Sequence, residues 1–530
     1  MVMNLYTNAI ELLASRCAYQ FTSLDLGLFN SIFADGAAAV TRGIKEAELI
    51  CQRIDQFLEW SGLQANVSKC SCFARRRQPS PAIFDPQLTL QSQPIPFLTD
   101  KKSYRYLGLP ISADLHCDVV KSELLDCVKY LFAQVDKTAL SRFSKCQLYK
   151  KAVLPRLAQL LRISNLPLSW IRSHLDTVVT RYLKKWVGLT HCAAVSRLFL
   201  DTNRGGFHLP QPSVFFQSLQ SSCLLRFTKS DDICLRTLAF AKISDEAQSS
   251  SSRFLPGAFL AEHSLTSGSL KNSLKFIKKQ TSEINCQNHF RHLSSLSVPG
   301  ATARCEDLEA AHWSISVKHL PDNLFKWAFN AIQETLPTAL NLCLWKKSES
   351  NQCSLCQQPE SLCHVLNACP ELLKLGLYKE RHDNVLALLY DFIKSNSSSD
   401  YQVLCDLPSL PYQFPNEIAL TTLRPDLVVY SCKLKKSWLL ELSVSFEPVA
   451  EDTKARKHLR YKELVQDAKS SYHTELLQLI IGSRGFIFSE TKRSLTRVCK
   501  PFKRDMDILF DNIIQAVIRS SYRCWINRKN

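Results

Sequence analysis

Asp426 and Glu441 are two carboxylates whose spacing could bring them to one cation. Asp426 precedes an apolar run, residues 427–430, and Glu441 lies inside a second run that begins at Trp438. Both runs are rich in β-branched and aromatic residues and a Lys-rich turn separates them, which predicts a two-stranded hairpin. If the turn is centred between residues 433 and 434, the two carboxylates face each other across the ladder, with Cβ atoms ~5 Å apart.

Carboxylates at that distance repel each other unless a cation lies between them. A hard divalent ion with oxygen ligands, Mg²⁺ or Mn²⁺, is the natural occupant. The next stretch is predicted to be helical and places Lys454, Lys457 and Arg460 at i, i+3 and i+6, roughly on one face. Carboxylates for a metal, followed by bases for a phosphate, are the groups that metal-assisted phosphodiester hydrolysis requires. An ordinary hairpin with solvent-facing charges is the alternative.

A second set of candidate ligands has the spacing C-x2-C-x7-H-x4-C and consists of Cys353, Cys356, His364 and Cys369. Zinc takes four soft or borderline ligands in a tetrahedron, and a C-x2-C turn supplies two of them. His364 at the start of a helix and Cys369 on its next turn supply the other two. Because four protein ligands leave no open position, we expect a structural zinc ion. Cys363 is a competing thiol beside His364.

The charge balance indicates a polyanionic partner. The chain has 66 Lys and Arg against 48 Asp and Glu, a formal net charge of +18. Residues 141–190 contain ten basic residues and one acid, and residues 491–530 contain ten basic residues and three acids. Such an excess on a chain of globular composition favours nucleic acid as the partner. Solvated helix faces are the alternative.

Length and cysteine usage limit the possible locations. A chain of 530 residues is long enough for roughly two to four domains. Its 21 cysteines are scattered, and neither a secretory signal nor an apolar run of ~20 residues is visible. We therefore expect a nuclear or cytoplasmic protein with reduced thiols, some of them binding metal, and no membrane partner.

Other segments must position these groups. Apolar residues recur with helical spacing over residues 44–58, and residues 112–190 are predicted to be all-helical. Residues 244–272 are polar and Ser-rich, which predicts a linker or mobile insert. Residues 308–344 are predicted to be helical, and residues 475–481 are predicted to form a further strand. The basic tail is predicted to be a helix whose core face consists of Ile508, Phe510, Ile513, Ile514 and Val517.

The hairpin and its following helix resemble the restriction-like endonuclease of site-specific LINE-type (non-long-terminal-repeat) retrotransposons, a nuclease of the PD-(D/E)XK class. The matching residues are Pro425-Asp426, Glu441 after fourteen intervening residues, and Lys457-His-Leu-Arg460-Tyr461. That class has a lysine two residues after the acid, where this chain has Ser443. The resemblance implies that Lys457 or Lys454 takes its place.

The resemblance also implies roles around the nuclease. Arg424, Arg460 and Tyr461 would support the site or contact DNA. The family carries the same Cys-Cys-His-Cys knuckle just ahead of its nuclease. Arg381-His382-Asp383 also matches a family element, with a general base or helix packing as the two roles open to His382.

The N-terminal part resembles the last third of a reverse-transcriptase palm. The matching residues are Phe33-Ala34-Asp35-Gly36, the helical pattern after them, and Tyr104-Arg-Tyr106-Leu107-Gly108. The family has a second Asp where this chain has Gly36, and Asp35 alone cannot hold two metals for nucleotidyl transfer. Residues 1–32 lack recognisable upstream palm segments. We therefore expect a truncated palm with a degenerate polymerase site at Asp35 and no reverse-transcriptase activity.

The expected architecture is α+β and multidomain. Its parts are a truncated palm (residues 1–111), a helical thumb-like region (112–242), a Ser-rich linker or mobile insert (243–300), a helical region with the zinc knuckle (301–375), and a small α/β restriction-like nuclease domain with a basic C-terminal helix (376–530). The thumb of the family grips template and primer, which implies that Lys184 and Lys185 contact nucleic acid.

We expect this chain to make metal-dependent nicks in target DNA, with element RNA as a second partner. Asp426 and Glu441 would bind Mg²⁺ or Mn²⁺, and Lys457 or Lys454 would neutralise the developing negative charge. One alternative is an RNA- or DNA-binding remnant that does not cleave. Another is a product of a decaying gene copy without function. A third is an RNA-directed DNA polymerase, if a longer gene product restores the missing palm.

Overall fold

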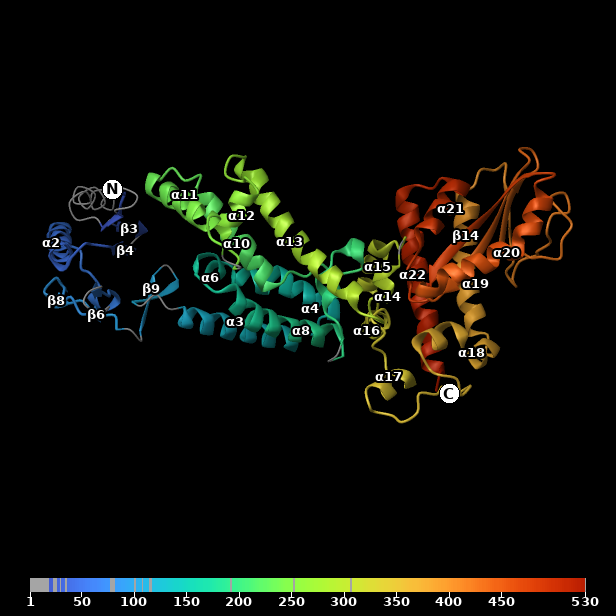
Figure 1. Cartoon of the computed structure of the whole chain (residues 1–530), viewed down its shortest axis with the longest axis horizontal. Helices are drawn as coiled ribbons and strands as arrows, with labels where there is room; N and C mark the ends of the chain where they lie inside the picture. The colour runs from blue at the N-terminus through green and yellow to red at the C-terminus, as the bar shows by residue number, and fades with distance from the viewer. Residues whose placement is uncertain are drawn as a thin grey trace. The chain divides into compact units, whose positions relative to one another are not determined.

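The computed structural model describes residues 19–21, 26–28, 30–33, 36–76, 82–99, 102–106, 108–113, 117–190, 193–250, 253–305 and 307–529. Over these residues the protein has a mixed α+β structure, mostly helical with small sheets (Figure 1). The chain divides into two compact units. Unit 1 comprises residues 1–137, 151–179 and 211–282, and unit 2 comprises residues 138–150, 180–210 and 283–530.

Short antiparallel hairpins and one long helix form the first part of unit 1. The strands pair in sequence order: β1 (Tyr19–Phe21) with β2 (Leu26–Leu28), β3 (Asn30–Phe33) with β4 (Gly36–Ala39), β5 (Ala74–Arg76) with β6 (Ala82–Phe84), β7 (Thr89–Leu90) with β8 (Gln93–Pro94), and β9 (Ser103–Tyr106) with β10 (Leu109–Ser112). The helix α2 (Ile44–Ser61) confirms the helical spacing of residues 44–58. It ends at Gly62, which has a φ of 68°. Glycine adopts this left-handed conformation readily because it has no Cβ. A single turn, η1 (Val67–Lys69), follows.

Residues 117–190, all of them described, are predominantly helical, as predicted. The elements are α3 (Asp118–Lys137), α4 (Arg142–Leu148), η2 (Tyr149–Val153), α5 (Leu154–Arg156), α6 (Ala158–Ile163), α7 (Leu168–Trp170), η3 (Ile171–Asp176) and α8 (Thr177–Val187). The apolar residues of α3 recur at i, i+4, i+8 and i+12 and are buried: Val120, Leu124, Val128 and Phe132.

The segment predicted as a linker or mobile insert differs in the structure, where it is largely helical. The elements around it are α10 (Pro212–Phe227), α11 (Ile233–Ala247), α12 (Pro256–Glu262) and α13 (Leu270–Ser295). Leu225, Leu260 and Ile277 form a common buried cluster with their neighbours. The Ser-rich run is short, and the apolar residues beyond it recur at helical spacing, so burial decides the structure there.

Unit 2 holds the remaining elements. They are α9 (Ser196–Phe199), η4 (Thr202–Arg204), α14 (Ala301–Arg304), α15 (Ala310–Ser316), η5 (Val317–His319), α16 (Asp322–Ala331), α17 (Ala339–Leu344), η6 (His364–Ala368), α18 (Pro370–Lys374), α19 (Leu377–Asn396), β11 (Gln402–Cys405), β12 (Leu427–Ser431), β13 (Lys436–Ser445), η7 (Glu447–Val449), α20 (Ala450–Ala468), β14 (His473–Gly482), α21 (Ser489–Cys499) and α22 (Lys503–Asn527). Helices at residues 310–344 and a strand over residues 475–481 confirm those two predictions.

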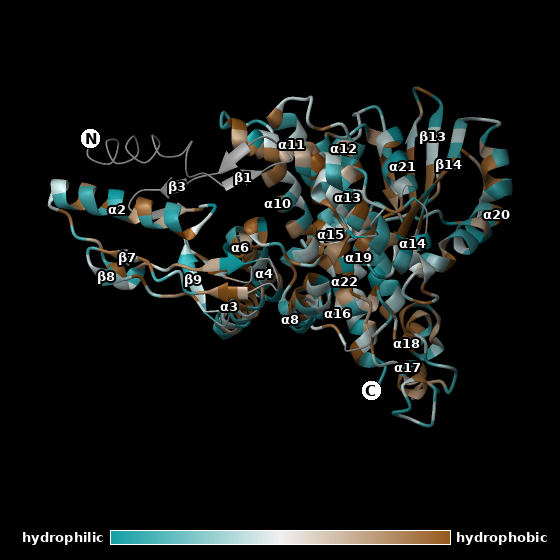
Figure 2. Ribbon diagram, turned by 60° about the vertical axis from the view of Figure 1, so that its left-hand side comes forward, coloured by the Kyte–Doolittle hydropathy of each residue, from teal (hydrophilic) through white to brown (hydrophobic). Residues whose placement is uncertain are grey.

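This unit contains a four-stranded sheet in the order β11-β12-β13-β14. The first two pairings are antiparallel, and β13 pairs with β14 in parallel across the connection that contains α20. Tyr461, Leu464 and Ala468 of α20 pack on Val428 and Leu439 of the sheet. Most of the α20 ribbon has the colour of hydrophilic residues in Figure 2, as expected of a helix that buries a single face.

The C-terminal helix α22 corrects one detail of the predicted core. It buries Phe510, Ile513, Ile514 and Val517, as predicted. Ile508 is 50% exposed, so its prediction as a core residue was wrong. The buried face begins instead with Met506 and Leu509, which lie four residues before Phe510 and Ile513, respectively.

Among the residues with described structure, no helix combines the length and the apolar character that crossing a bilayer requires.

Candidate functional site

The hairpin has the predicted register. Leu427 of β12 pairs with Leu440 of β13, and the ladder closes with Ser431 opposite Lys436. Continuing this register by one residue away from the turn places Asp426 opposite Glu441, as predicted. The backbone N–H of Asp426 donates a hydrogen bond to Glu441 Oε1 at 3.1 Å. The prediction of a hairpin that brings these two acids together is therefore confirmed.

The two acids lie where β12 and β13 separate. None of the described strands continues the β12 side of the ladder past Leu440, so this edge of β13 needs other hydrogen-bond partners. Asp426 Oδ2 accepts a hydrogen bond from the backbone N–H of Leu442 at 2.8 Å. Lys457 Nζ donates to the carbonyl oxygen of Leu442. Side chains of the site thus complete the hydrogen bonding of the strand that carries Glu441.

Lys457, and not Lys454, reaches the acids. Its Nζ lies 2.8 Å from Glu441 Oε2 and 3.4 Å from Asp426 Oδ2. Lys454 is turned to Glu490, with Nζ 2.5 Å from Oε2. Of the two lysines predicted for the site, the structure brings only Lys457 together with the carboxylates. We call Asp426, Glu441 and Lys457 the carboxylate–lysine cluster.

His382 of α19 is a member of the site that the prediction did not place. Its Nε2 lies 3.4 Å from Asp426 Oδ1, and its Nδ1 lies 3.2 Å from Asp383 Oδ1. The neighbouring Arg381 is buried and donates to Ser521 Oγ at 3.1 Å. The only sequence signal for His382 was the Arg381-His382-Asp383 element, whose role the sequence left open.

The two carboxylates have different electrostatic surroundings. Burial raises the pKa of Asp426, but the hydrogen bond with His382 and the charge of Lys457 outweigh burial and hold that pKa at about 2. Burial and the charge of Asp426 raise the pKa of Glu441 above its ordinary value. Burial lowers the pKa of His382, but Asp426 and Asp383 outweigh it and raise this pKa. The pair is therefore asymmetric, with Asp426 the more strongly ionised acid.

The residues predicted to support the site or contact DNA divide into two groups. Arg424 is bound by Asp406, with Nε 3.2 Å from Oδ2, and lies over the ring of Tyr412. Arg460 is exposed beside Tyr461. Tyr461 is 1% exposed, and its hydroxyl donates to the carbonyl oxygen of Arg424 at 3.2 Å. Tyr461 is therefore a core residue that supports the site, and Arg424 and Arg460 are the ones that solvent reaches.

Three other predicted residues lie away from this cluster or outside the description. Lys184 and Lys185 lie in the last turn of α8. Asp35 lies outside the described residues, although the flanking strands β3 and β4 pair as a hairpin with Phe33 opposite Gly36.

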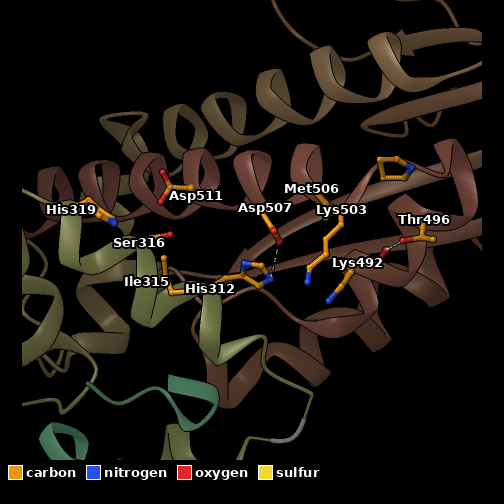
Figure 3. A pocket seen from close by; sticks show the side chains of 11 residues that line it. His312, Ile315, Ser316, His319, Lys492, Thr496, Lys503, Met506, Asp507 and Asp511 are labelled. Atoms are coloured by element: carbon orange, nitrogen blue, oxygen red, sulfur yellow. Dashed lines mark hydrogen bonds and ion pairs between the residues drawn. The ribbon is translucent and has the colours of Figure 1, made fainter. Parts of the chain in front are cut away.

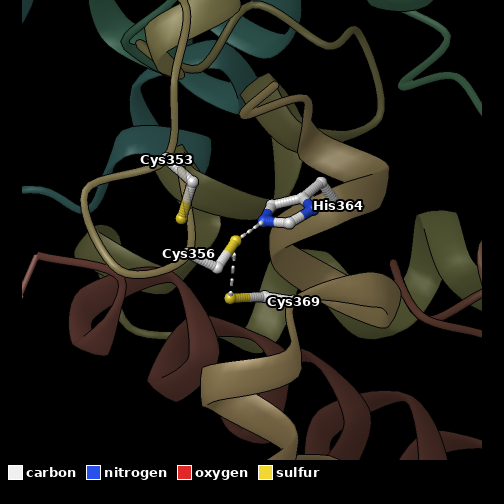
Figure 4. Close-up of side chains that lie close together, drawn as sticks. All are labelled: Cys353, Cys356, His364 and Cys369. Carbon is white, nitrogen blue, oxygen red and sulfur yellow. Dashed lines mark hydrogen bonds between the residues drawn. The ribbon is translucent and has the colours of Figure 1, made fainter. Parts of the chain in front are cut away.

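The four predicted zinc ligands lie together. Their ligand atoms are all within 4.8 Å of one another, and Figure 4 shows the side chains converging. Cys356 Sγ lies 3.3 Å from His364 Nε2 and 3.9 Å from Cys369 Sγ. Around a tetrahedral zinc ion, sulfur atoms are ~3.8 Å apart and sulfur and nitrogen ~3.5 Å apart. We call Cys353, Cys356, His364 and Cys369 the Cys3His cluster, and its geometry fits zinc.

The surroundings of the Cys3His cluster suit metal binding. Burial lowers the pKa of His364, which favours the neutral imidazole that binds metals. Burial raises the pKa of Cys369 to about 11, so metal binding there must release a proton. The hydroxyl of Tyr378 accepts a hydrogen bond from the N–H of Cys369 at 3.1 Å and donates to the carbonyl oxygen of Val365 at 2.9 Å. Cys363, the competing thiol, is not a member of the cluster.

A cavity of about 780 Å³ in the same unit is lined by α15, α21 and α22 (Figure 3). Three of its charged side chains form ion pairs, and one of these pairs is with Glu309, which lies outside the lining. His312 Nε2 lies 3.8 Å from Asp507 Oδ1, and Lys492 Nζ lies 3.3 Å from Glu309 Oε2. Burial lowers the pKa of His312. The cavity lining includes no member of either cluster, so we place the candidate chemistry at the clusters.

Comparison with known protein families finds no family model that matches the chain, and comparison with curated proteins finds no matching relative.

Proposed function

We propose that the carboxylate–lysine cluster is the active site of a metal-dependent DNA endonuclease of the restriction-like PD-(D/E)XK type. The observation that carries this proposal is the convergence of Asp426, Glu441 and Lys457 where β12 and β13 separate. The three residues come from the residue before β12, from β13 and from α20. In a hairpin whose charged residues simply face solvent, no lysine from a separate helix would need to contact both acids. Two acids and a base at the open end of a hairpin suit the hydrolysis of a phosphodiester bond.

The donor set of the cluster fits a hard divalent cation. The oxygens in contact with Lys457 Nζ are the carboxylates of Asp426 and Glu441 and the carbonyl of Leu442. Oxygen donors of these kinds are the ligands that Mg²⁺ and Mn²⁺ prefer. Such an ion, when bound, supplies Lewis-acid stabilisation of the phosphate and lowers the pKa of a bound water. Asp426 and Glu441 would hold it.

The protein's own side chains would contribute in three ways. Lys457 is a fixed positive charge beside the carboxylates and would neutralise the negative charge that develops on the scissile phosphate. His382 keeps Asp426 ionised, because an imidazole beside a carboxylate favours its charged form. Arg460 and Arg424 are exposed near the site and would contact the DNA backbone.

We further propose that the chain derives from a site-specific LINE-type retrotransposon, with a structural zinc ion in the Cys3His cluster and a reverse-transcriptase part that does not polymerise. The order of motifs in the sequence and Gly36 in place of the second palm acid support this origin. The net charge of +18 supports target DNA and element RNA as partners.

A second candidate function is binding of nucleic acid without cleavage. It is favoured by Lys457, whose ammonium already contacts both carboxylates and forms an internal ion pair that neutralises part of their charge. A buried ion pair of this kind can be purely structural.

Nicking of supercoiled plasmid by the full chain separates the two candidates. Mg²⁺, Mn²⁺ and a chelator would be compared for the native chain, Asp426→Asn and Asp467→Asn, an exposed aspartate on α20 that serves as the matched control. The nuclease proposal expects metal-dependent nicking that Asp426→Asn abolishes and Asp467→Asn retains. DNA binding without nicking by any of the three proteins would overturn it in favour of the binding function.

A further inference from the structure

The carbonyl oxygen of Val444, three residues after Glu441, has two side-chain donors. Asn367 Nδ2 donates to it at 2.9 Å, and Arg381 Nη2 lies 3.5 Å from it. This carbonyl belongs to the part of β13 that lies beyond the β12 pairing, where partners on that edge must come from side chains. Both donors therefore hold the segment of β13 that carries Glu441.

Asn367 lies in the chain between two ligands of the Cys3His cluster. It lies in η6, between the ligands His364 and Cys369, so a metal bound by the cluster would fix both ends of the segment that presents its amide. Only two residues separate Asn367 from His364 and one separates it from Cys369, which leaves the amide little freedom once both ligands are held.

Arg381 is connected to the same cluster by a different route. Its guanidinium lies 5.5 Å from the ring centroid of Tyr378, whose hydroxyl bonds to the backbone at Cys369 and Val365. Arg381 also donates to Ser521 Oγ at 3.1 Å. The second donor to Val444 is thus held by the same ligand segment and by α22.

We propose that the Cys3His cluster positions the carboxylate–lysine cluster, and that Asn367 is the positioning residue that connects them. This inference rests on the proposed nuclease function. A metal ion in the Cys3His cluster fixes η6, Asn367 then fixes the Val444 carbonyl, and β13 holds Glu441 at its distance from Asp426. Asn367 contacts neither DNA nor the reacting atoms in this scheme.

The physical basis is the short, stiff path between the two clusters. Glu441 and Val444 are ~10 Å apart along an extended strand, at ~3.3 Å per residue. β14 pairs with β13 through Ser445, so the strand moves as a unit and not as a loop. Metal ligands must be held within ~0.5 Å of the productive geometry, so a small shift at Val444 is sufficient to weaken a cation site at Glu441.

The test compares Asn367→Ala and Asn367→Asp with Asn384→Ala in the full chain. Asn367→Asp keeps the shape of the side chain but removes the N–H donor. Asn384 is the matched control, because its amide Nδ2 lies 3.5 Å from Ser520 Oγ of α22 and thus bonds to a different element than the Asn367 amide. Zinc content, plasmid nicking as a function of Mn²⁺, and hydrogen exchange of residues 441–446 would be measured for each.

We expect all three variants to retain zinc. Both Asn367 variants should need ~10-fold or more Mn²⁺ for half-maximal nicking, as is typical when an outer-shell partner of a metal ligand is lost. Their DNA affinity should not change, and Asn384→Ala should behave as the native chain. Hydrogen exchange of residues 441–446 should accelerate in the Asn367 variants and, in the native chain, on removal of zinc.

Native Mn²⁺ dependence and native hydrogen exchange in Asn367→Asp would overturn the positioning role while leaving the nuclease proposal intact. If the native chain does not nick at all, the nuclease proposal fails, and hydrogen exchange still decides whether η6 holds β13. Faster exchange in Asn384→Ala as well would show general loosening and would also overturn the specific role of Asn367.

Discussion

The two clusters of unit 2 differ in how their charge is balanced. The Cys3His cluster gathers four donor atoms within 4.8 Å of one another, and none of its four members is a cationic side chain. The carboxylate–lysine cluster includes its own cation, the ammonium of Lys457, within 3.4 Å of both acids. Ionised thiolates without an internal cation need an external cation, whereas carboxylates that are paired with an ammonium do not. The first cluster is therefore suited to a permanent metal, whereas the proposed nuclease function would require an exchangeable one at the second.

Removal of a zinc ligand should have the largest effect. Cys356→Ser should abolish zinc binding and lower the free energy of unfolding by roughly 5 kcal/mol, part of the ~10–16 kcal/mol that structural zinc contributes in zinc-finger peptides. Metal analysis and urea unfolding would measure both. Cys363→Ser is the control, since this thiol adjoins His364 but lies outside the cluster. Retention of zinc by Cys356→Ser, with its loss in Cys363→Ser, would show that the ligand set is wrong.

Lys457→Met should reduce the difference between the clusters, because it removes the internal cation. Two carboxylates would then lie unpaired, and the Glu441 side chain is only 3% exposed. We expect a loss of ~3 kcal/mol, at the low end for a broken buried ion pair, because a quarter of Lys457 is exposed. Thermal unfolding would measure the loss.

Mn²⁺ sharpens this prediction. It should raise the Tm of Lys457→Met more than that of the native chain, because the acids can then bind the metal without competition from an ammonium. Lys462→Met, at an exposed position of the same helix, should match the native chain in both measurements. If Mn²⁺ stabilises no variant, the carboxylate–lysine cluster is a structural ion pair. The two clusters would then differ in that only the Cys3His cluster binds a metal.

The sequence predicted those features of the site that depend on local spacing. The register that opposes Asp426 and Glu441 follows from symmetry about one short turn. The Cys3His ligands lie within one short segment, so their spacing alone indicates zinc.

Features that depend on tertiary packing could not be predicted in this way. His382 precedes Asp426 by 44 residues, and only the packing of α19 brings it to the site. The choice of Lys457 over Lys454 depends on where α20 crosses β13, because the two lysines share a helix face and differ by ~4.5 Å along its axis. Ile508 was assigned to the wrong face for a related reason, since one residue of helical phase separates it from the buried Leu509.

Asp176 of unit 1 is a buried carboxylate that can be compared with Asp426. It accepts its hydrogen bonds from a serine. Oδ1 accepts from the N–H of Ser213 at 2.9 Å, and Oδ2 lies 2.5 Å from Ser213 Oγ. Burial raises the pKa of Asp176 to about 6, opposite in direction to the shift of Asp426. The folded chain therefore binds this proton more tightly than the unfolded chain, whose aspartates titrate near pH ~4.

The stabilisation from protonated Asp176 should be complete below pH ~4 and lost as pH rises through about 6. The expected change is at most ~3 kcal/mol, from ~1.4 kcal/mol per pKa unit. Asp176→Asn should retain the hydrogen bonds and remove this pH dependence, so its Tm relative to the native chain should increase between pH 4 and pH 7. Asp245→Asn, at an exposed position of the same unit, is the control. A constant difference in Tm would show that Asp176 is ionised throughout.

His382→Gln should have the smallest effect on stability. Asp426 would keep the N–H of Leu442 and the charge of Lys457, and the lost contact, at 3.4 Å, joins two side chains that are both partly exposed. We expect a loss of ~1 kcal/mol or less in urea unfolding. His458→Gln, exposed on α20, is the control. A loss as large as that of Lys457→Met would mean that the imidazole is the main counter-ion of Asp426. The internal cation of this cluster would then be a titratable one, which protons as well as metals could displace.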